Sequence, residues 1–149
     1  MYKHILVPTD GSALSDKAVE AALKLAKLSG AHVTAFHAVE PYPLQGAYAA
    51  EASGVAELQP EIFAERSEEY AKRVLAAFAA AAAAANVQCS TAYATSRSAS
   101  QAIIEKANQE KCDLIVMASH CRRGLEGFLL GSETQKVLTH STIPVLVYR

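Results

Sequence analysis

The sequence predicts an α/β fold, in which a doubly wound, Rossmann-like sheet of parallel strands carries helices on both faces. Two short apolar runs, residues 5–7 and 114–117, are continuous rather than alternating, as is typical of strands buried on both faces. Segments with helical spacing of apolar residues separate the strands, and such alternation requires right-handed crossovers. The length of 149 residues is usual for one domain, so we expect a single domain over residues 1–149.

The first part of the chain is predicted to hold two strands and one helix. The strand at 5–7 is followed by apolar residues at helical spacing over 13–29, and Gly30 stands where a C-terminal cap belongs. Residues 32–39 form the second strand. The stretch 41–60 is rich in alanine, glycine and serine without a clear period, so it is either a lid or an irregular crossover.

A long helix is expected next, over residues 61–86, because its second half is almost entirely alanine, the strongest helix former. Its predicted buried face consists of Phe63, Tyr70, Val74, Phe78, Ala81 and Ala85. The remaining elements are strand 87–95, helix 98–109, strand 114–117, helix 133–140 and strand 144–148. Ser98 and Gln101 have the spacing of a capping box at the start of their helix.

Charge and hydropathy argue against nucleic acid and membranes as partners. The formal net charge is -1, from 14 Lys plus Arg against 15 Asp plus Glu, so the overall field does not attract nucleic acid. No apolar stretch reaches the roughly 18 residues of a membrane helix, and no signal peptide is recognisable. We therefore expect a cytoplasmic protein with neither a nucleic-acid nor a membrane partner.

Three cysteines, Cys89, Cys112 and Cys121, fit neither a disulfide framework nor a metal site. Cys89 and Cys112 lie beside predicted strands and are expected to act as small apolar fillers. Cys121 precedes two arginines, which would favour its thiolate. It is either a redox-sensitive thiol or a tolerated loop substitution.

Two loops at the carboxyl ends of strands are the candidate site, because ligands of open α/β sheets bind where the strand order reverses. The loop after the first strand, residues 8–12, offers a carboxylate, two hydroxyls and a glycine at the mouth of a helix. Asp10 could hold ribose hydroxyls or a metal ion on phosphates. Alternatively, Asp10 and Ser12 only cap the following helix.

The loop after the fourth strand, residues 118–132, ends in Gly131 and Ser132 at the start of a helix. Unpaired N–H groups and a partial positive charge would make this helix end an anion site. Ser132 and Gln135 also have capping-box spacing, which is the purely structural interpretation. The loop has no Gly-Lys-Ser/Thr and is therefore not a Walker motif.

Four segments together resemble the universal stress protein family over essentially the whole chain. They are Pro-Thr-Asp-Gly-Ser at 8–12, Met-Ala-Ser-His-Cys-Arg-Arg-Gly-Leu at 117–125, Leu-Leu-Gly-Ser-Glu-Thr-Gln-Lys-Val-Leu at 129–138 and Pro-Val-Leu-Val at 144–147. The resemblance implies a five-stranded parallel sheet in the order 3-2-1-4-5. That order would place the ends of strands one and four side by side, so the two candidate loops would meet.

The resemblance also implies an adenine-nucleotide site, for ATP with Mg²⁺ bound through its phosphates. The residues that it places there are Pro8, Thr9, Asp10, Ala38, Val39, Met117, Ala118, His120, Cys121, Arg122, Gly131, Ser132, Glu133 and Thr134. ATP-binding members carry Gly-x2-Gly-x9-Gly-Ser/Thr, a register that falls here on Ala118, Cys121, Gly131 and Ser132. Two of the three glycines are thus replaced, and the Cys121 side chain would intrude where backbone approaches phosphate.

Two functions follow from this pattern. The first is a cytoplasmic stress-response module that binds ATP and forms a homodimer through its last strand, with Val145 and Val147 near the axis. The second is a nucleotide-free dimeric interaction protein. No catalytic residues and no protein-held metal are expected. A hydrolytic triad of Asp10, Ser12 and His120 would lack a nucleophile elbow. ATP hydrolysis would at most be weak, because no base is placed to orient water.

Overall fold

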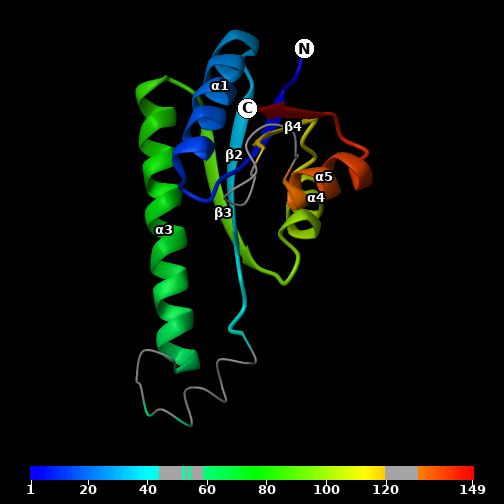
Figure 1. Cartoon of the computed structure of the whole chain (residues 1–149). Coiled ribbons are helices and arrows are strands. Elements are labelled where there is room, and N and C mark those ends of the chain that lie inside the picture. The colour runs from blue at the N-terminus through cyan, green and yellow to red at the C-terminus, as the bar shows by residue number, and fades with distance from the viewer. Residues whose placement is uncertain (44–51, 53, 55–58, 120–130) are drawn as a thin grey trace.

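A five-stranded parallel sheet in the order β3-β2-β1-β4-β5 forms the centre of the molecule (Figure 1), which confirms the predicted order. The computed structural model describes residues 1–43, 52, 54, 59–119 and 131–149. Its elements are β1 (His4–Pro8), α1 (Ala13–Ser29), β2 (His32–Val39), α3 (Pro60–Ala84), β3 (Cys89–Thr95), α4 (Ala99–Gln109), β4 (Leu114–Ala118), α5 (Ser132–His140) and β5 (Val145–Tyr148). No helix among these residues is long and apolar enough to cross a membrane.

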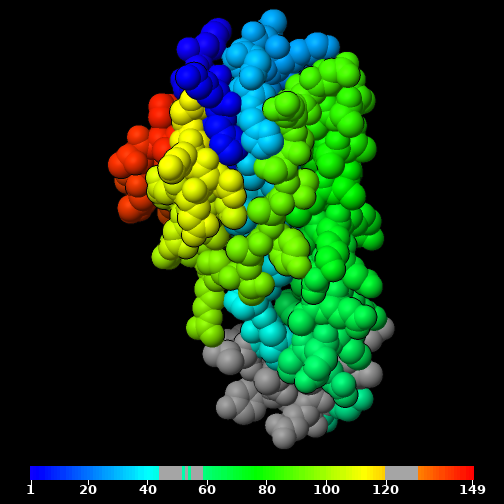
Figure 2. All heavy atoms as spheres, turned by 180° about the vertical axis from the view of Figure 1, so that it is seen from behind, coloured from blue at the N-terminus to red at the C-terminus, as the bar shows by residue number. Residues whose placement is uncertain are grey.

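Helices cover both faces of the sheet, as a doubly wound fold requires. Ile5 and Val7 of the central strand face α1 and α3, whereas Leu6 faces α4 and α5, and all three are fully buried. Figure 2 views the molecule from behind, with α4 and α5 over that face and α3 rising along the side. Burial on both faces explains why the strand is continuously apolar.

The buried face of α3 differs from the predicted one. The sheet covers Ala71, Leu75, Phe78 and Ala82, so of the predicted face only Phe78 is fully buried. The buried face of α3 is displaced by about one residue from the predicted face, because Tyr70 and Val74 pack against the turn after β1 instead of the sheet. In the alanine-rich half every face of the helix is equally apolar, so spacing alone could not select one.

Helix ends follow the predicted caps at two positions. Gly30 ends α1 in the left-handed region with φ 69°, and Ser98 Oγ accepts a hydrogen bond from the Gln101 amide at the start of α4. Cys112 is buried in the core under α4 and α5, as expected of an apolar filler, and burial raises the pKa of its thiol to about 12. Most of the 41–60 loop and Cys121 lie outside the described residues.

Candidate functional site

The turn after β1 is organised by Thr9. Its amide donates to the Phe36 carbonyl oxygen of β2 at 2.9 Å, which continues the sheet for one residue. Its hydroxyl oxygen accepts from the Gly11 amide at 3.2 Å and from the Ser15 hydroxyl of α1 at 2.8 Å. The Thr9 side chain is therefore buried inside the turn and joins the end of the strand to the helix.

Asp10 and Ser12 occupy the exposed side of this turn. The Asp10 carboxylate accepts from the Ser12 amide at 3.0 Å, and the Ser12 hydroxyl accepts from the Ser15 amide at 3.2 Å as the N-cap of α1. The capping role that the sequence allowed is thus present. The bond from the Ser12 amide uses one lone pair of the Asp10 carboxylate, and Asp10 is exposed at the edge of the sheet.

Helix α3 holds the turn from the other side. The Tyr70 hydroxyl donates to the Asp10 carbonyl oxygen at 2.6 Å, and the Arg73 guanidinium lies over the Tyr70 ring at 5.2 Å from its centroid. Gly11 has φ +75°, and a Cβ built there would lie 2.8 Å from Val74 Cγ2. The turn and α3 approach so closely that only glycine fits without a movement of the Val74 side chain or of the helix.

His37, near the end of β2, joins the same turn. Its Nδ1 lies 2.7 Å from the Thr9 carbonyl oxygen, its ring centroid is 5.7 Å from that of Tyr70, and the residue is only 8% exposed. A carbonyl oxygen can only accept, so Nδ1 carries the hydrogen. The sequence interpretation missed both His37 and Tyr70, although the strand phase of β2 already turned His37 toward the face that carries α3.

The end of β4 lies beside the end of β1, as predicted, because the two strands pair in register at Ile5 with Leu114 and at Leu6 with Ile115. Ala118 is buried, and its carbonyl oxygen accepts from the Thr134 hydroxyl at 3.2 Å. Ala118 is not among the described residues with positive φ, so its methyl group causes no backbone strain. Thr134 is 1% exposed and its side chain fixes α5 to the strand.

Among the residues that the structure describes, no side chain caps the N-terminus of α5. Gly131 is the N-cap residue, and its carbonyl oxygen accepts from the Gln135 amide at 2.9 Å. The capping box predicted for Ser132 is therefore wrong: Ser132 is the first helical residue, and its side chain is exposed. The amides of residues 132–134 have no acceptor within the helix, which makes this end suitable for an anion.

The Glu133 side chain is engaged within the protein. Its carboxylate accepts from the Ser100 amide of α4 at 2.8 Å and from Lys136 Nζ at 2.7 Å. The hydrogen bond from Lys136, followed by that from Ser100, lowers the pKa of Glu133 against the opposing effect of partial burial. Glu133 therefore joins the starts of α4 and α5. Its backbone N–H, rather than its side chain, is the group that could bind an anion.

The other predicted site residues fall into two groups. Pro8 pairs with Phe36, so Ala38 and Val39 extend β2 beyond the end of β1. Val39 and Met117 are both buried. His120, Cys121 and Arg122 lie outside the described residues.

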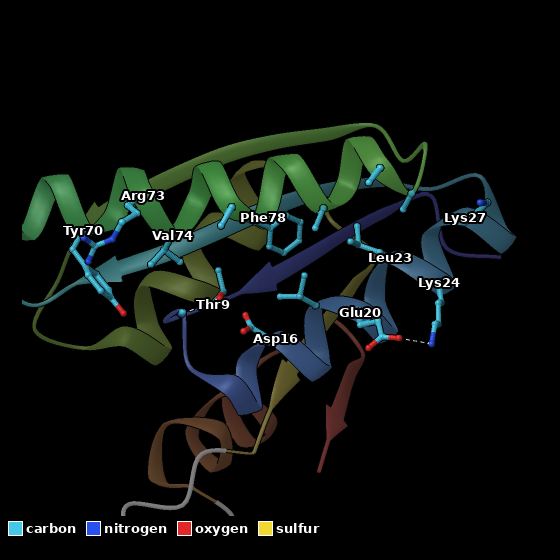
Figure 3. A pocket seen from close by; sticks show the side chains of 16 residues that line it. Thr9, Asp16, Glu20, Leu23, Lys24, Lys27, Tyr70, Arg73, Val74 and Phe78 are labelled. Carbon is cyan, nitrogen blue, oxygen red and sulfur yellow. Dashed lines mark hydrogen bonds and ion pairs between the residues drawn. The ribbon is translucent and has the colours of Figure 1, made fainter.

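Two hollows adjoin the turn after β1. The larger, of about 870 Å³, runs between α1 and α3 over Leu23, Val74 and Phe78 and reaches the turn only at its end (Figure 3). The smaller, of about 360 Å³, lies where β2 ends against α3. Its walls are His37, Val39, Glu40, Phe63, Arg66, Ser67 and Tyr70. The smaller hollow opens where β2 ends, and the larger one meets the end of β1 through Thr9 and Gly11.

The whole chain is similar to known proteins of one family. The model of the universal stress protein family matches residues 1–149. A universal stress protein of Methanocaldococcus jannaschii is 36% identical over 149 residues, which are 100% of this chain and 83% of that protein.

Solved structures of universal stress proteins have the same fold. A family protein of Burkholderia pseudomallei superposes with a TM-score of 0.76 at 24% identity, over 99% of this chain and 96% of that one. A universal stress protein in complex with cAMP gives a TM-score of 0.72 at 25% identity, over 99% of this chain and 97% of that one. The chain therefore belongs to the universal stress protein family.

Proposed function

We propose that this protein is a stress-response binding module that holds an adenine nucleotide, specifically ATP, at the carboxyl edge of its sheet. The observation that carries the proposal is the N-terminus of α5, for which the described part of the chain supplies no side-chain cap and which follows β4, the strand that pairs with β1. One end of this arrangement suits phosphates and the other offers an exposed carboxylate to a ribose. The universal stress protein in complex with cAMP supports an adenine nucleotide as the ligand class.

The roles would be divided along the edge of the sheet. Asp10 would accept from ribose hydroxyls, while Ala38 and Val39 would border the base. Phosphates would lie against the backbone of Gly131, Ser132, Glu133 and Thr134, with Mg²⁺ bound through the phosphates rather than by the protein. Pro8, Thr9, Met117 and Ala118 would form the floor, and His120, Cys121 and Arg122 would close the phosphate side.

A nucleotide-free interaction protein is the second candidate function. Replacement of two family glycines by Ala118 and Cys121 favours it, because side chains reduce the space left for phosphate oxygens. The absence of strain at Ala118 leaves Cys121 as the substitution that decides between the two functions.

Titration calorimetry of nucleotide-stripped protein with ATP separates the two functions. We expect saturable binding, together with a nucleotide that mass spectrometry detects in protein purified without stripping. No heat of binding at millimolar ATP would exclude the nucleotide function and leave the interaction protein. Cys121→Gly should bind ATP more tightly than the native chain, and an unchanged affinity would refute the steric argument. Any phosphate release should be slow, since the proposed role is binding rather than turnover.

The same proposal includes a homodimer through β5, an edge strand of the sheet. The carbonyl oxygen of Pro144 accepts from the Ile115 amide of β4, and that of Tyr148 accepts from the Ser119 amide just after β4. The alternation of a parallel ladder therefore turns the amides of Val145 and Val147 to the open edge. Such an edge is a template for pairing with a second copy. Light scattering after size exclusion should give the mass of a dimer at micromolar concentration, whereas the mass of a monomer would contradict it.

A further inference from the structure

A row of polar side chains crosses β1, β2 and β3 near the start of these strands, at the edge of the sheet opposite the candidate site. His4 Nε2 lies 2.8 Å from the Thr34 hydroxyl oxygen. That oxygen lies 2.9 Å from the Ser90 hydroxyl oxygen, which in turn lies 2.9 Å from His32 Nε2. The two imidazole rings meet edge to face, with their centroids 4.8 Å apart. We call these four residues the histidine row.

A count of hydrogens shows what the two rings contribute to the histidine row. Its three hydrogen bonds need three hydrogens, but each of the two hydroxyls supplies only one. At least one histidine must therefore carry a hydrogen on Nε2 and donate it into the row. Thr34 is only 1% exposed, so water cannot replace a missing bond at its hydroxyl.

The charges around the histidine row decide which ring donates. The Asp113 carboxylate binds the amides of Lys3 and His4 at 2.8 and 3.0 Å, and it attracts a positive charge on His4. Burial, and then the charge of His4, lower the pKa of His32, against a smaller opposite effect of Glu110 at the end of α4. His4 is therefore the end of the row that donates, and His32 is the end that accepts through Nε2.

We infer that the histidine row is an acid-sensitive switch, which takes up one proton at His4 without rearrangement and reverses its last hydrogen bond when a second proton reaches His32. A proton from solvent enters His4 at Nδ1, because Nε2 already carries a hydrogen, and every bond of the row remains. Neutral His32 carries its hydrogen on Nδ1, so the second proton can enter only at Nε2, the atom that accepts from Ser90. Two imidazolium rings would also repel each other at 4.8 Å.

Reversal of this bond would disturb the start of the strands. After the second proton, His32 donates to the Ser90 oxygen, and the Ser90 hydrogen must leave the row. The adjoining backbone depends on the same segment, because the His32 amide donates to the Lys3 carbonyl oxygen and the Val33 amide to the Gln88 carbonyl oxygen, both at 2.9 Å. Acid should therefore loosen the amino edge of the sheet. The inference is independent of the proposed nucleotide function, which concerns the carboxyl edge.

NMR of the imidazole nitrogens in the full chain measures tautomer and protonation directly. At pH 8, where a free imidazole is neutral, we expect a hydrogen on Nε2 of His4 and on Nδ1 of His32. As the pH falls, His4 should titrate first, and the two midpoints of the pair should lie more than about one pH unit apart. Exchange of the His32 and Val33 amides, corrected for its intrinsic pH dependence, should become about tenfold faster across the second step.

Ser90→Ala removes the last hydrogen bond of the histidine row without changing its charge. The second proton then reverses no bond, so the gap between the two midpoints should narrow. Thr91→Ala is the matched control, because Thr91 is the next residue of β3, is exposed and points to the other face of the sheet. It should keep the native gap.

The same tautomer in both rings at pH 8, or one midpoint shared by both, would overturn the inference. An unchanged gap in Ser90→Ala would also overturn it, because repulsion between the rings would then be the whole effect. Amide exchange at His32 and Val33 that ignores the second step would show that the row does not control the amino edge of the sheet, and would equally overturn the switch.

Discussion

The hydroxyl of Tyr70 donates a hydrogen bond of 2.6 Å to the backbone carbonyl oxygen of Asp10, across 60 residues of sequence. This contact fixes the turn after β1 to the middle of α3. The orientation of the Asp10 carboxylate therefore depends on α3 as well as on its own strand.

Tyr70→Phe should weaken ATP binding several-fold while lowering stability only slightly. Loss of the hydrogen bond should lower the free energy of unfolding by about 0.5–1 kcal/mol, because water can bind the exposed Asp10 carbonyl oxygen in place of the hydroxyl. The loosened turn would no longer hold Asp10 in one orientation. Urea denaturation and calorimetric titration measure the two effects separately.

Tyr93→Phe is the matched control for this substitution. Its hydroxyl donates to the Glu68 carboxylate at 2.9 Å, and it has nearly the same exposure, but it lies on β3 away from the turn. It should lose similar stability and no affinity. Equal ATP affinities for both variants would show that the Tyr70 contact does not position the site.

Gly11→Ala should destabilise the protein by more than a left-handed backbone alone explains. Gly11 and Gly30 have φ +75° and +69°, so alanine at either costs about 1–2 kcal/mol for the backbone. At Gly11 the new Cβ would also meet Val74 Cγ2 at 2.8 Å, whereas at Gly30 nothing lies within 4 Å. We expect Gly11→Ala to cost about 1 kcal/mol more than Gly30→Ala.

Urea unfolding of the two glycine variants gives this difference directly. If both lose the same free energy of unfolding, α3 moves away without cost and the close packing of the turn is not a constraint. A larger loss at Gly11 should also be accompanied by weaker ATP binding, since the displaced helix carries Tyr70.

The sheet could be predicted from the sequence because its signals are local. Continuous apolar runs mark the buried strands, and a resemblance spread over four segments implied their order. Boundaries were within two residues throughout, as at β3, which begins at Cys89 rather than at residue 87. Gly30 and Ser98 were recognisable caps because each residue type has a conformational reason to stand there.

The site was only partly predictable because its key contacts join distant residues. His37 meets Thr9 across 28 residues of sequence and Tyr70 meets Asp10 across 60, and no periodic pattern encodes such pairs. The Ser132 capping box failed for a different reason. Its spacing was correct, but the helix begins one residue earlier at its cap, where Gly131 supplies only backbone.

Stability should fall as the pH drops below neutrality, because His32 titrates abnormally. Burial, and then the charge of neighbouring His4, lower the pKa of His32 below its usual 6.5, against a smaller opposite effect of Glu110. The rings of His4 and His32 lie 4.8 Å apart, and His32 Nε2 is 2.9 Å from the Ser90 hydroxyl. The folded protein therefore favours the neutral imidazole.

The sign of the effect follows from the lowered pKa. The contribution of His32 to the free energy of unfolding is fully present above the unfolded pKa of about 6.5, and it is lost as the pH falls toward the lower pKa of the folded state. Urea unfolding between pH 7.5 and 5.5 should show this loss, and His32→Gln should flatten it. An identical slope in His32→Gln would assign the pH dependence to other groups.

Glu133→Gln should destabilise the protein at pH 7 without weakening ATP binding. The carboxylate accepts from the Ser100 amide at 2.8 Å in the first turn of α4, where a negative charge contributes about 0.3–1 kcal/mol; its ion pair with exposed Lys136 adds little. Glutamine keeps an acceptor for Ser100 but loses the charge. Phosphates would meet the Glu133 amide, which the substitution does not change.

The pKa of Glu133 is lowered, so its stabilising effect is present above the ordinary value of 4.5 and disappears as the pH falls through the folded value. Native and Glu133→Gln chains should therefore differ in urea unfolding at pH 7 and converge as the pH falls below 4.5. Glu105→Gln, which alters an exposed pair with Gln101 on α4, should have a smaller effect at pH 7. A large loss of ATP affinity in Glu133→Gln alone would mean that the side chain leaves Ser100 to take part in binding, and α5 would then rearrange when the nucleotide arrives.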